Sequence, residues 1–450
     1  MRVLMLGWEF PPHISGGLGT ACYGLTKGLD EIGVQVCFVL PTAIPVESSS
    51  HVAFRSPTNL LARSESWVEQ YSKVFGHVDF RQVPAALQPY ARPGPPDRRA
   101  VTTARTEPTT VRQGRSVLEE MSIVAGAGSV PSGSFVRGAG VNYQGDMMTQ
   151  VHRYARLALG ISEYEAFDVI HAHDWMTYPA GLAIAAVTGK PLVIHVHSTE
   201  FDRSGDNVDQ RVYDIERAGM HGAARVVCVS HYTRGIVLSR YGVPPERVEV
   251  VHNAVELPDE GEWSLKPIRR NEKIVLFLGR MTMQKGPEYF LMAAKKVVER
   301  FKNVRFVMAG SGDMVTQCIR LAADLRLGGY VTFTGFLRGK DVDKVFSMAD
   351  LYVMPSVSEP FGIAPLEALS HNVPVIISKQ SGVSEVLSHA LKVDFWDTDE
   401  MANQILAVLR HPPLQKTLRQ HGHIELQKLS WKDSATKLKG IYDDVLTARA

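Results

Sequence analysis

The stretch Leu351–Ser370, LYVMPSVSEPFGIAPLEALS, contains a strand, a loop and a helix in direct succession. Leu351–Met354 is a short apolar run, which is typical of a buried strand. Pro360 and Gly362 shape the loop that follows, and Pro365 fits the first turn of a helix over Pro365–Ser370. A strand that leads through a loop into a helix is one βα unit. This stretch therefore predicts a parallel sheet that is covered by helices.

The same alternation of apolar runs and helical patterns extends over most of the chain, which predicts an α/β fold with doubly wound sheets. In the N-terminal half we expect strands at Val3–Leu6, Val34–Leu40, Val169–Ala172, Leu192–Val196, Val226–Val229 and Val248–Val251. In the C-terminal half we expect strands at Ile274–Leu278, Arg305–Ala309, Val331–Thr334, Leu351–Met354 and Pro374–Ile377.

Length and composition limit the class of protein. The chain has 450 residues, which is too long for one compact core and favours two domains. A net charge of +2 argues against nucleic acid as a partner. We find neither a signal peptide nor an apolar stretch long enough to span a membrane, so we expect a cytoplasmic protein without integral membrane association. The four cysteines form no CxxC pair, and we expect reduced, packed thiols.

Two irregular stretches suggest the domain organisation. Residues 256–271, ELPDEGEWSLKPIRRN, break the alternation, and we interpret them as a linker. Residues 1–255 then form an N-terminal domain and residues 272–430 a second domain. Residues 431–450 form a C-terminal helix that could pack back on the N-terminal domain. Residues 85–145 are rich in Pro, Gly, Ser, Thr and Arg, which is typical of a disordered insertion.

A glycine-rich turn follows the first strand. Gly16 and Gly17 precede a helical pattern over Thr20–Leu29, and small residues allow backbone amides to approach a phosphate at a helix N-terminus. Cys22 replaces the third glycine of a dinucleotide-binding fingerprint, so that class of site is not indicated. The alternative interpretation is a tight turn without a ligand.

Two cations follow the strand Ile274–Leu278. Arg280 and Lys285 lie just beyond its end, where doubly wound sheets bind ligands, and a fixed Arg and Lys suit a diphosphate. The alternative interpretation is a pair of solvated surface cations.

Two carboxylates flank the loop that opens the helix Pro365–Ser370. The N-terminus of this helix can offer the amides of Ile363 and Ala364 to a diphosphate. Glu359 would face a sugar from the loop, and Glu367 would face ribose hydroxyls. The alternative for Glu367 is an acid that only complements the helix dipole.

Four histidines alternate along two predicted strands, at positions 171, 173, 195 and 197. No acidic cluster or HExxH motif accompanies them, so we predict no metal site. His197 ends its strand next to polar residues and should line a cleft. His171 and His195 are better explained as core residues with satisfied hydrogen bonds.

Together these motifs resemble a retaining glycosyltransferase of the GT-B fold, in which two Rossmann-like domains face a cleft. The resemblance is strongest to glycosyltransferase family 4 and to bacterial glycogen (starch) synthases. The matching stretches, in chain order, are residues 8–19 (WEFPPHISGGLG), 171–175 (HAHDW), 195–197 (HVH), 251–253 (VHN), 279–286 (GRMTMQKG), and 356–362 (SVSEPFG) through Glu367.

This resemblance implies a role for each matching residue. Arg280 and Lys285 would hold the donor diphosphate, Glu359 and His197 would lie at the donor sugar, and Glu367 would bind the ribose. Asp174 would lie on the acceptor side. The remaining donor-side positions are Gly16 and Gly17 near phosphate and acceptor, Gly335 and Phe336 beside the nucleobase, Gly382 with an amide towards the sugar, and Phe361, Gly362, Ile363 and Ala364 in the loop.

The resemblance also implies an activity. The enzyme would transfer glucose from UDP- or ADP-glucose, with retention, to an α-glucan or another saccharide, and would need no metal or other cofactor. Bacterial glycogen synthases usually lack a carboxylate at the position of Glu367, which moves the resemblance towards family 4 or the eukaryotic type. The alternatives are a family-4 enzyme that makes a small glycoside or an envelope saccharide, and a non-catalytic protein that binds sugar nucleotides.

Overall fold

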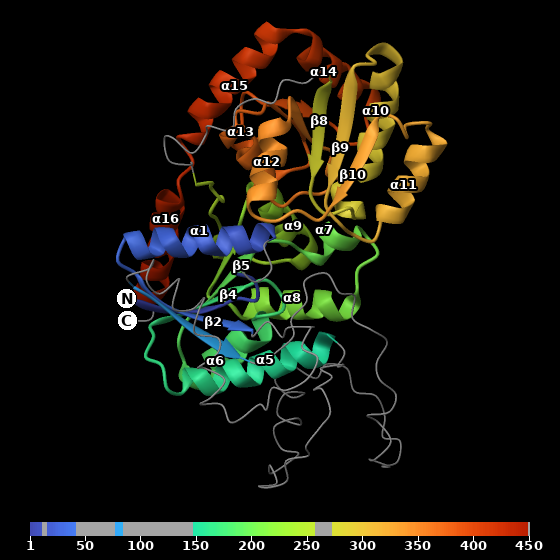
Figure 1. Cartoon of the computed structure of the whole chain (residues 1–450). Coiled ribbons are helices and arrows are strands. Elements are labelled where there is room, and N and C mark those ends of the chain that lie inside the picture. Colours follow the sequence, from blue (N-terminus) through green and yellow to red (C-terminus); the bar gives the residue numbers. More distant parts are fainter. Residues whose placement is uncertain (11–15, 42–76, 84–146, 257–271, 449–450) are drawn as a thin grey trace, which may run out of the picture.

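The computed structural model describes residues 1–10, 16–41, 77–83, 147–256 and 272–448, and it contains two α/β domains stacked one above the other (Figure 1). Each domain is built on one sheet in which all paired strands are parallel. The predicted fold class, two Rossmann-like doubly wound domains, is confirmed.

The first sheet has the strand order β3-β2-β1-β4-β5-β6-β7. Its strands are β1 (Arg2–Leu6), β2 (Gln35–Pro41), β3 (Val78–Val83), β4 (Val169–His173), β5 (Leu192–Val196), β6 (Arg225–Cys228) and β7 (Val248–Val250). The central strands are buried along their length because helices cover both faces.

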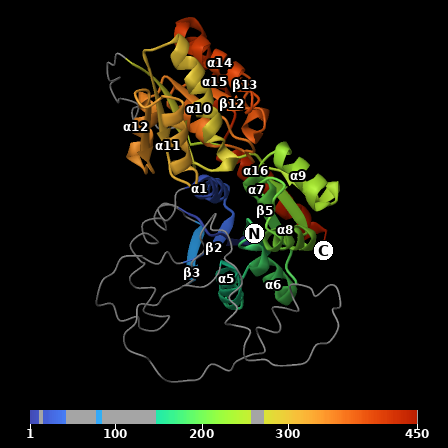
Figure 2. The same ribbon diagram turned by 90° about the vertical axis from the view of Figure 1, so that its right-hand side faces the viewer.

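Figures 1 and 2 show α1 (Gly17–Glu31) on one face of this sheet, and α5 (Met147–Ser162) and α6 (Tyr178–Thr188) on the other. The remaining helices of this domain are α7 (Glu200–Ser204), α8 (Gln210–Gly222), α9 (His231–Tyr241) and the 3₁₀ helix η2 (Pro245–Arg247). α1 begins three residues before the predicted run, directly at the glycine turn, because Gly16 is its N-cap.

The second sheet has the order β10-β9-β8-β11-β12-β13. Its strands are β8 (Lys273–Leu278), β9 (Val304–Ala309), β10 (Val331–Gly335), β11 (Leu351–Met354), β12 (Val375–Ser378) and β13 (Leu391–Val393). The helices of this domain are η3 (Met283–Lys285), α10 (Pro287–Arg300), α11 (Val315–Asp324), α12 (Lys340–Met348), α13 (Ala364–Ser370), η4 (Gly382–Glu385), α14 (Thr398–Arg410) and α15 (Pro412–Leu426).

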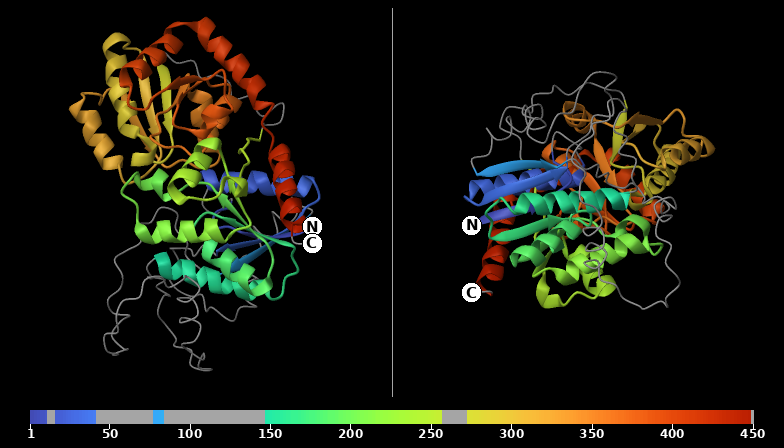
Figure 3. Two further views of the ribbon diagram at one scale, coloured as in Figure 1. Left: turned by 180° about the vertical axis from the view of Figure 1, so that it is seen from behind. Right: turned by 90° about the horizontal axis from the view of Figure 1, so that it is seen from below.

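The last helix, α16 (Trp431–Thr447), lies against the first domain and packs on α1 (Figures 1 and 3). Trp431 is buried, and it contacts α1 where Gly24 and Gly28 leave room for it. A Cβ atom at Gly24 would lie 2.1 Å from the indole, so a larger residue there would displace this helix.

The predicted strands agree with the structure to within about one residue at each end, but β3 and β13 were not predicted. Both are edge strands and carry charged residues, such as Asp79 and Lys392, which hide the apolar pattern. The predicted insertion at 85–145 and all but the first residue of the predicted linker lie outside the described residues.

The four cysteines are free and buried, as predicted. Among the helices in the described ranges, none combines the length and the apolar character that crossing a membrane would need.

Candidate active site

Several of the predicted site residues follow the strands at the two points where the strand order reverses. In the first sheet the order reverses between β1 and β4, and in the second sheet it reverses between β8 and β11. In doubly wound sheets, the connections on the two sides of such a reversal generally diverge, and ligands bind in the crevice that results. Gly16 and Asp174 follow β1 and β4, while Arg280, Lys285 and Glu359 follow β8 and β11.

Lys285 and Glu359 form an ion pair through the Lys285 Nζ and the Glu359 Oε2. Lys285 ends η3, which follows β8, and Glu359 lies in the loop after β11. The Ser356 hydroxyl also donates to the same carboxylate oxygen at 3.1 Å. Because the Glu359 residue is only 5% exposed, its carboxylate depends on these two donors. The sequence separates the two residues, and the fold brings the predicted cation and carboxylate into direct contact.

The loop after Glu359 leads directly into α13. Pro365 lies in the first turn, as predicted, and the helix begins one residue earlier than expected, at Ala364. Among the described residues, the amides of Ile363 and Ala364 have no backbone partner. Phe361 is 2% exposed and packs near His252, with 6.0 Å between the ring centroids. Its side chain therefore anchors the loop in the core.

Glu367 lies in the first turn of α13 and is partly buried. Burial raises the pKa of its carboxyl group from 4.5 to about 7, and the negative charge of Asp343 on α12 adds to this shift. A carboxyl group with this pKa is not optimised for stability, and such groups cluster at functional sites.

The predicted nucleobase side of the site lies at the end of β10. Gly335 ends this strand, and the side chain of Phe336 is 52% exposed. The Arg338 guanidinium lies over the Phe336 ring, with its Cζ 5.1 Å from the ring centre. An exposed aromatic ring with a cation over one face offers a stacking surface for a planar base.

We predicted that the Gly382 amide faces the sugar, but in the structure this amide is bonded within the protein. The Gly382 N–H donates to the Glu359 carbonyl at 2.9 Å, and the Val383 N–H donates to the Phe361 carbonyl at 2.7 Å. These amides are already used to hold the Glu359 loop against η4. Gly382 therefore shapes the loop and does not present its amide to a sugar.

On the side of the first domain, the carboxylate of Glu9 lies at the N-terminus of α1, although Glu9 itself follows β1. It is 2% exposed, and its Oε1 accepts a hydrogen bond from the Gly16 N–H. Burial raises the pKa of Glu9 to about 7, although the bond from Gly16 and the charge of Arg280 both lower it. The Gly16 amide, which we predicted to face a phosphate, is thus occupied by a carboxylate of the same domain. Gly17 is exposed, and the space at its Cα is open.

Asp174 follows β4 and is 5% exposed, with a φ of 59°. Its Oδ1 accepts hydrogen bonds from the His197 N–H at 2.8 Å and from the Ser198 N–H at 3.3 Å. Burial raises the pKa of Asp174 to about 7, while Arg203 and the two amides lower it. This carboxylate therefore holds the end of β5, a role that its predicted place on the acceptor side did not include.

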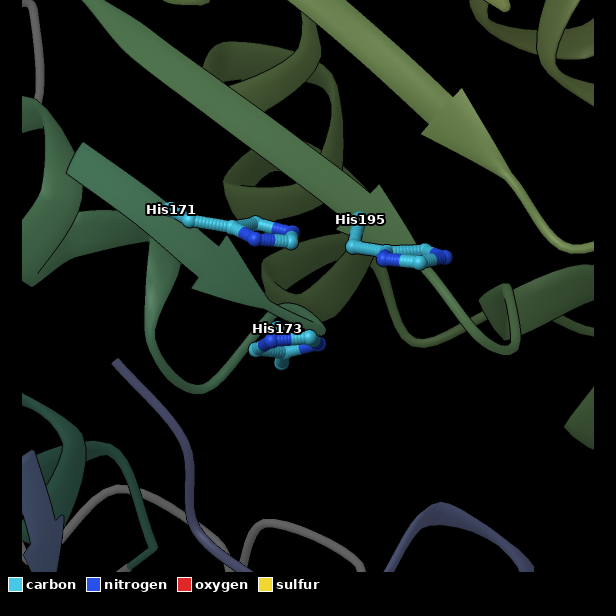
Figure 4. Close-up of side chains that lie close together, drawn as sticks. All are labelled: His171, His173 and His195. Atoms are coloured by element: carbon cyan, nitrogen blue, oxygen red, sulfur yellow. The ribbon is translucent and has the colours of Figure 1, made fainter. Parts of the chain in front are cut away.

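The four histidines form a compact group on one face of β4 and β5. The rings of His171 and His195 lie side by side, and His173 lies next to both (Figure 4). His171 Nδ1 bonds the Tyr442 hydroxyl of α16 at 2.5 Å, and His173 Nδ1 lies 2.8 Å from His197 Nε2. Burial lowers the pKa of all four imidazoles, so they are neutral near pH 7.

The interpretation of His195 as a satisfied core residue is wrong, since neither ring nitrogen has a hydrogen-bond partner within the described part of the chain. His171 and His173 each leave Nε2 without a partner there as well. The three residues place one ring nitrogen each within 4.8 Å of one another, so they could hold a metal ion. A second such group, His231, His252 and Glu385, is more exposed. Neither group includes a residue that we assign to the donor.

Polar contacts join the two domains around the Glu359 loop. The Ser358 hydroxyl donates to Asp202 at 2.5 Å, and the Ser230 hydroxyl donates to the Pro360 carbonyl, also at 2.5 Å. Glu385 of η4 accepts hydrogen bonds from the His231 and Tyr232 amides at the start of α9. These contacts fix the loop that carries Glu359 against α7 and the start of α9, which follow β5 and β6 of the first domain.

Sequence reasoning missed two features of the site. The first is Glu9, a charged residue just after an apolar strand. The same pattern identified Arg280, so the sequence alone could have identified Glu9. Gly310 and Gly312 follow β9, and a Cβ atom at Gly310 would lie 1.8 Å from the Gly279 carbonyl. This close approach requires a glycine beside the turn that carries Arg280.

The fold and these two facing sets of loops define a two-domain protein of the GT-B class. Three family models match the chain: the starch synthase catalytic domain over residues 2–90, glycosyltransferase family 4 over residues 126–258, and glycosyl transferases group 1 over residues 264–424. The chain belongs to the GT-B glycosyltransferases and is an enzyme of this group, as its sequence predicts.

Several relatives share this assignment. An uncharacterized glycosyltransferase of Methanocaldococcus jannaschii is 27% identical over 98% of both chains. An alpha-maltose-1-phosphate synthase of Mycolicibacterium smegmatis is 30% identical over 51% of this chain and 64% of its own length. Among solved structures, the sucrose-phosphate synthase of Thermosynechococcus elongatus aligns over 99% of both chains with a TM-score of 0.68 at 18% identity, which shows similarity of fold.

Proposed function

We propose that this enzyme transfers glucose from UDP- or ADP-glucose to an α-glucan, with retention of the anomeric configuration, as a glycogen synthase does. The observation that carries the proposal is the contact between Lys285 and Glu359. It places a cation suited to a diphosphate beside a carboxylate suited to sugar hydroxyls, at the point where the strand order of the second sheet reverses.

The leaving diphosphate gains negative charge as the bond to the sugar breaks. Arg280 and Lys285 would stabilise this charge, together with the Ile363 and Ala364 amides at the start of α13. Removal of one fixed donor of this kind typically lowers the rate roughly 10²–10³-fold. The reaction would then need no metal ion, and Glu367 would bind the ribose of the same donor.

His197 is proposed to contact the donor sugar from the end of β5. Burial keeps its imidazole neutral, because the charged form is disfavoured and its pKa is lowered. With Nε2 bonded to His173, the neutral ring leaves Nδ1 for a sugar hydroxyl, and it places no positive charge beside an oxocarbenium-like transition state. The contacts that join Ser358 and Pro360 to the first domain would help to exclude water from the reacting sugar.

A second candidate is transfer of a sugar to a small acceptor or to an envelope saccharide. It is favoured by the presence of Glu367, because bacterial glycogen synthases usually lack a carboxylate at this position. Burial raises the pKa of Glu367 to about 7, whereas an acid that only complements a helix dipole would be exposed. The second candidate is also favoured by relatives with such names, among them the D-inositol 3-phosphate glycosyltransferase of Pseudarthrobacter chlorophenolicus, which is 27% identical over 60% of this chain and 69% of its own length. A non-catalytic sugar-nucleotide-binding protein would not need both Glu359 and its paired cation.

One experiment separates these functions. The purified protein is incubated with a panel of sugar nucleotides that includes UDP-glucose and ADP-glucose, once with glycogen and once with small acceptors such as inositol phosphate. Nucleotide release and labelling of the acceptor are measured. Labelled glycogen with α-linked glucose supports the first function, and labelled small acceptors alone support the second. Donor binding without release of nucleotide from any combination would contradict both.

A further inference from the structure

His173 is a fully buried histidine at the end of β4 to which the proposed mechanism gives no role. Its Nδ1 lies 2.8 Å from the Nε2 of His197. Burial lowers the pKa of both residues, so both rings are neutral and one must donate its N–H to the lone pair of the other. This bond therefore links the tautomers of the two rings and fixes the orientation of His197.

The backbone of His197 is held from the same strand end. Asp174, the residue after His173, accepts the His197 N–H at 2.8 Å. The positive φ of Asp174 turns the chain at the end of β4 while its side chain reaches the neighbouring strand. Two consecutive residues thus hold the ring and the main chain of His197.

Stability alone does not explain an imidazole at position 173. Its Nε2 has no hydrogen-bond partner in the described part of the chain, and Phe38 packs beside the ring at 6.3 Å between centroids. A buried polar atom without a partner is unfavourable, and an apolar side chain of similar size would avoid this cost. The bond to His197 is the one polar contact of the His173 side chain among the described residues.

We propose that His173 is a positioning residue, which sets the tautomer and ring orientation with which His197 meets the donor sugar. This inference rests on the proposed role of His197 at the donor. The physical logic is that of a buried partner that orients a functional imidazole through its second ring nitrogen.

The test compares His173→Leu with His173→Asn. Leu and Asn have similar branched shapes, but only Asn carries a polar group near the position of Nδ1. We expect His173→Leu to lower kcat about tenfold, the effect of losing one hydrogen bond, with the donor KM changed by less than about twofold. His173→Asn should recover most of the lost kcat. The melting temperature of His173→Leu should stay close to that of the wild type, because the variant removes the unpaired Nε2 of His173 but leaves His197 Nε2 without its partner.

His171→Leu is the matched control. His171 lies on the same strand with the same burial, but it bonds Tyr442 and not His197. Its kcat should stay within about twofold of the wild type. If His173→Leu and His173→Asn lose activity equally, and both lose thermal stability, the residue acts through packing and the proposal is overturned. A wild-type kcat in His173→Leu would also overturn it.

A second measurement does not depend on turnover. Side-chain ¹⁵N NMR of histidine-labelled protein reports the tautomer and hydrogen bonding of each ring, and His197 is assigned with the His197→Gln variant. We expect the His197 signals to move in His173→Leu and to remain in His171→Leu. If they do not move in His173→Leu, the proposal fails. If the wild type transfers no sugar but these signals do move, the proposed function fails and the positioning contact stands.

Discussion

Replacement of Glu367 by Gln should stabilise the protein at pH 8 and weaken donor binding at the same time. Burial raises the pKa of this carboxyl group from 4.5 to about 7, so its ionised form is unfavourable in the native state. The unfolded chain carries no such penalty. A neutral amide of the same size removes the penalty, but it also removes the charge that we assign to the ribose hydroxyls.

The size of the expected stabilisation follows from the pKa shift of Glu367. A shift from 4.5 to about 7 is worth at most about 3.4 kcal/mol at 1.36 kcal/mol for each unit. Because the side chain is only partly buried, water reduces this value, and we expect about 1–2 kcal/mol. For a chain of this size, that corresponds to an increase in melting temperature of about 2 °C.

The difference in stability between Glu367→Gln and the wild type depends on pH. Below pH 4.5 the group is protonated in both the native and the unfolded state, so the two proteins should not differ through this group. Between pH 4.5 and about 7 the native state binds more protons, and the stability of the wild type falls as the pH rises. The advantage of the Gln variant therefore develops over this window and is complete above it.

Thermal melting of both proteins from pH 5 to pH 8.5, with donor KM measured in parallel, tests this reasoning. Glu400→Gln is the matched control, because Glu400 is an exposed acid in the first turn of α14. It should lose a few tenths of a kcal/mol at every pH in this range through the helix dipole. If Glu367→Gln also melts lower at pH 8 and binds the donor normally, Glu367 merely complements a helix dipole and our assignment is wrong.

The other predictions concern the donor site. Lys285→Ala and Arg280→Ala should each lower kcat about 10²-fold or more while the protein stays folded by circular dichroism; near-normal turnover in both would contradict the diphosphate assignment. Glu359→Gln should lower kcat with little change in donor KM, and a changed KM with normal kcat would mean that the roles of Glu359 and Glu367 are exchanged. Turnover should persist after treatment with EDTA, since fixed cations and amides handle the leaving group; loss of activity that a divalent ion restores would refute this.

The sequence predicted the buried central strands of both sheets most accurately. Parallel strands that are buried on both faces have continuous apolar runs, and for this reason Leu192–Val196 and Leu351–Met354 were predicted to the residue. The edge strands β3 and β13 were missed because one side of an edge strand is not covered, and charged residues interrupt the pattern there.

For the site, the sequence could indicate which residues follow strand ends but not which atoms they contact. The pairing of Lys285 with Glu359 depends on β8 and β11 being neighbours, an arrangement that no local pattern reports. The use of the Gly382 amide within the loop depends on a bridge between Glu359 and Ser381. Likewise, the hydrogen bond from the Gly16 amide to Glu9 joins residues seven positions apart, and no local pattern reports it.

The packing of Trp431 against Gly24 and Gly28 has a consequence for synthesis on the ribosome. Chains emerge from the N-terminus, and N-terminal domains generally fold first. Here the face of α1 that receives Trp431 and Ala435 stays uncovered until α16 has been made, after the whole second domain. The first domain therefore completes its core last, and a chain that stops before residue 431 would expose this apolar face to aggregation and proteolysis.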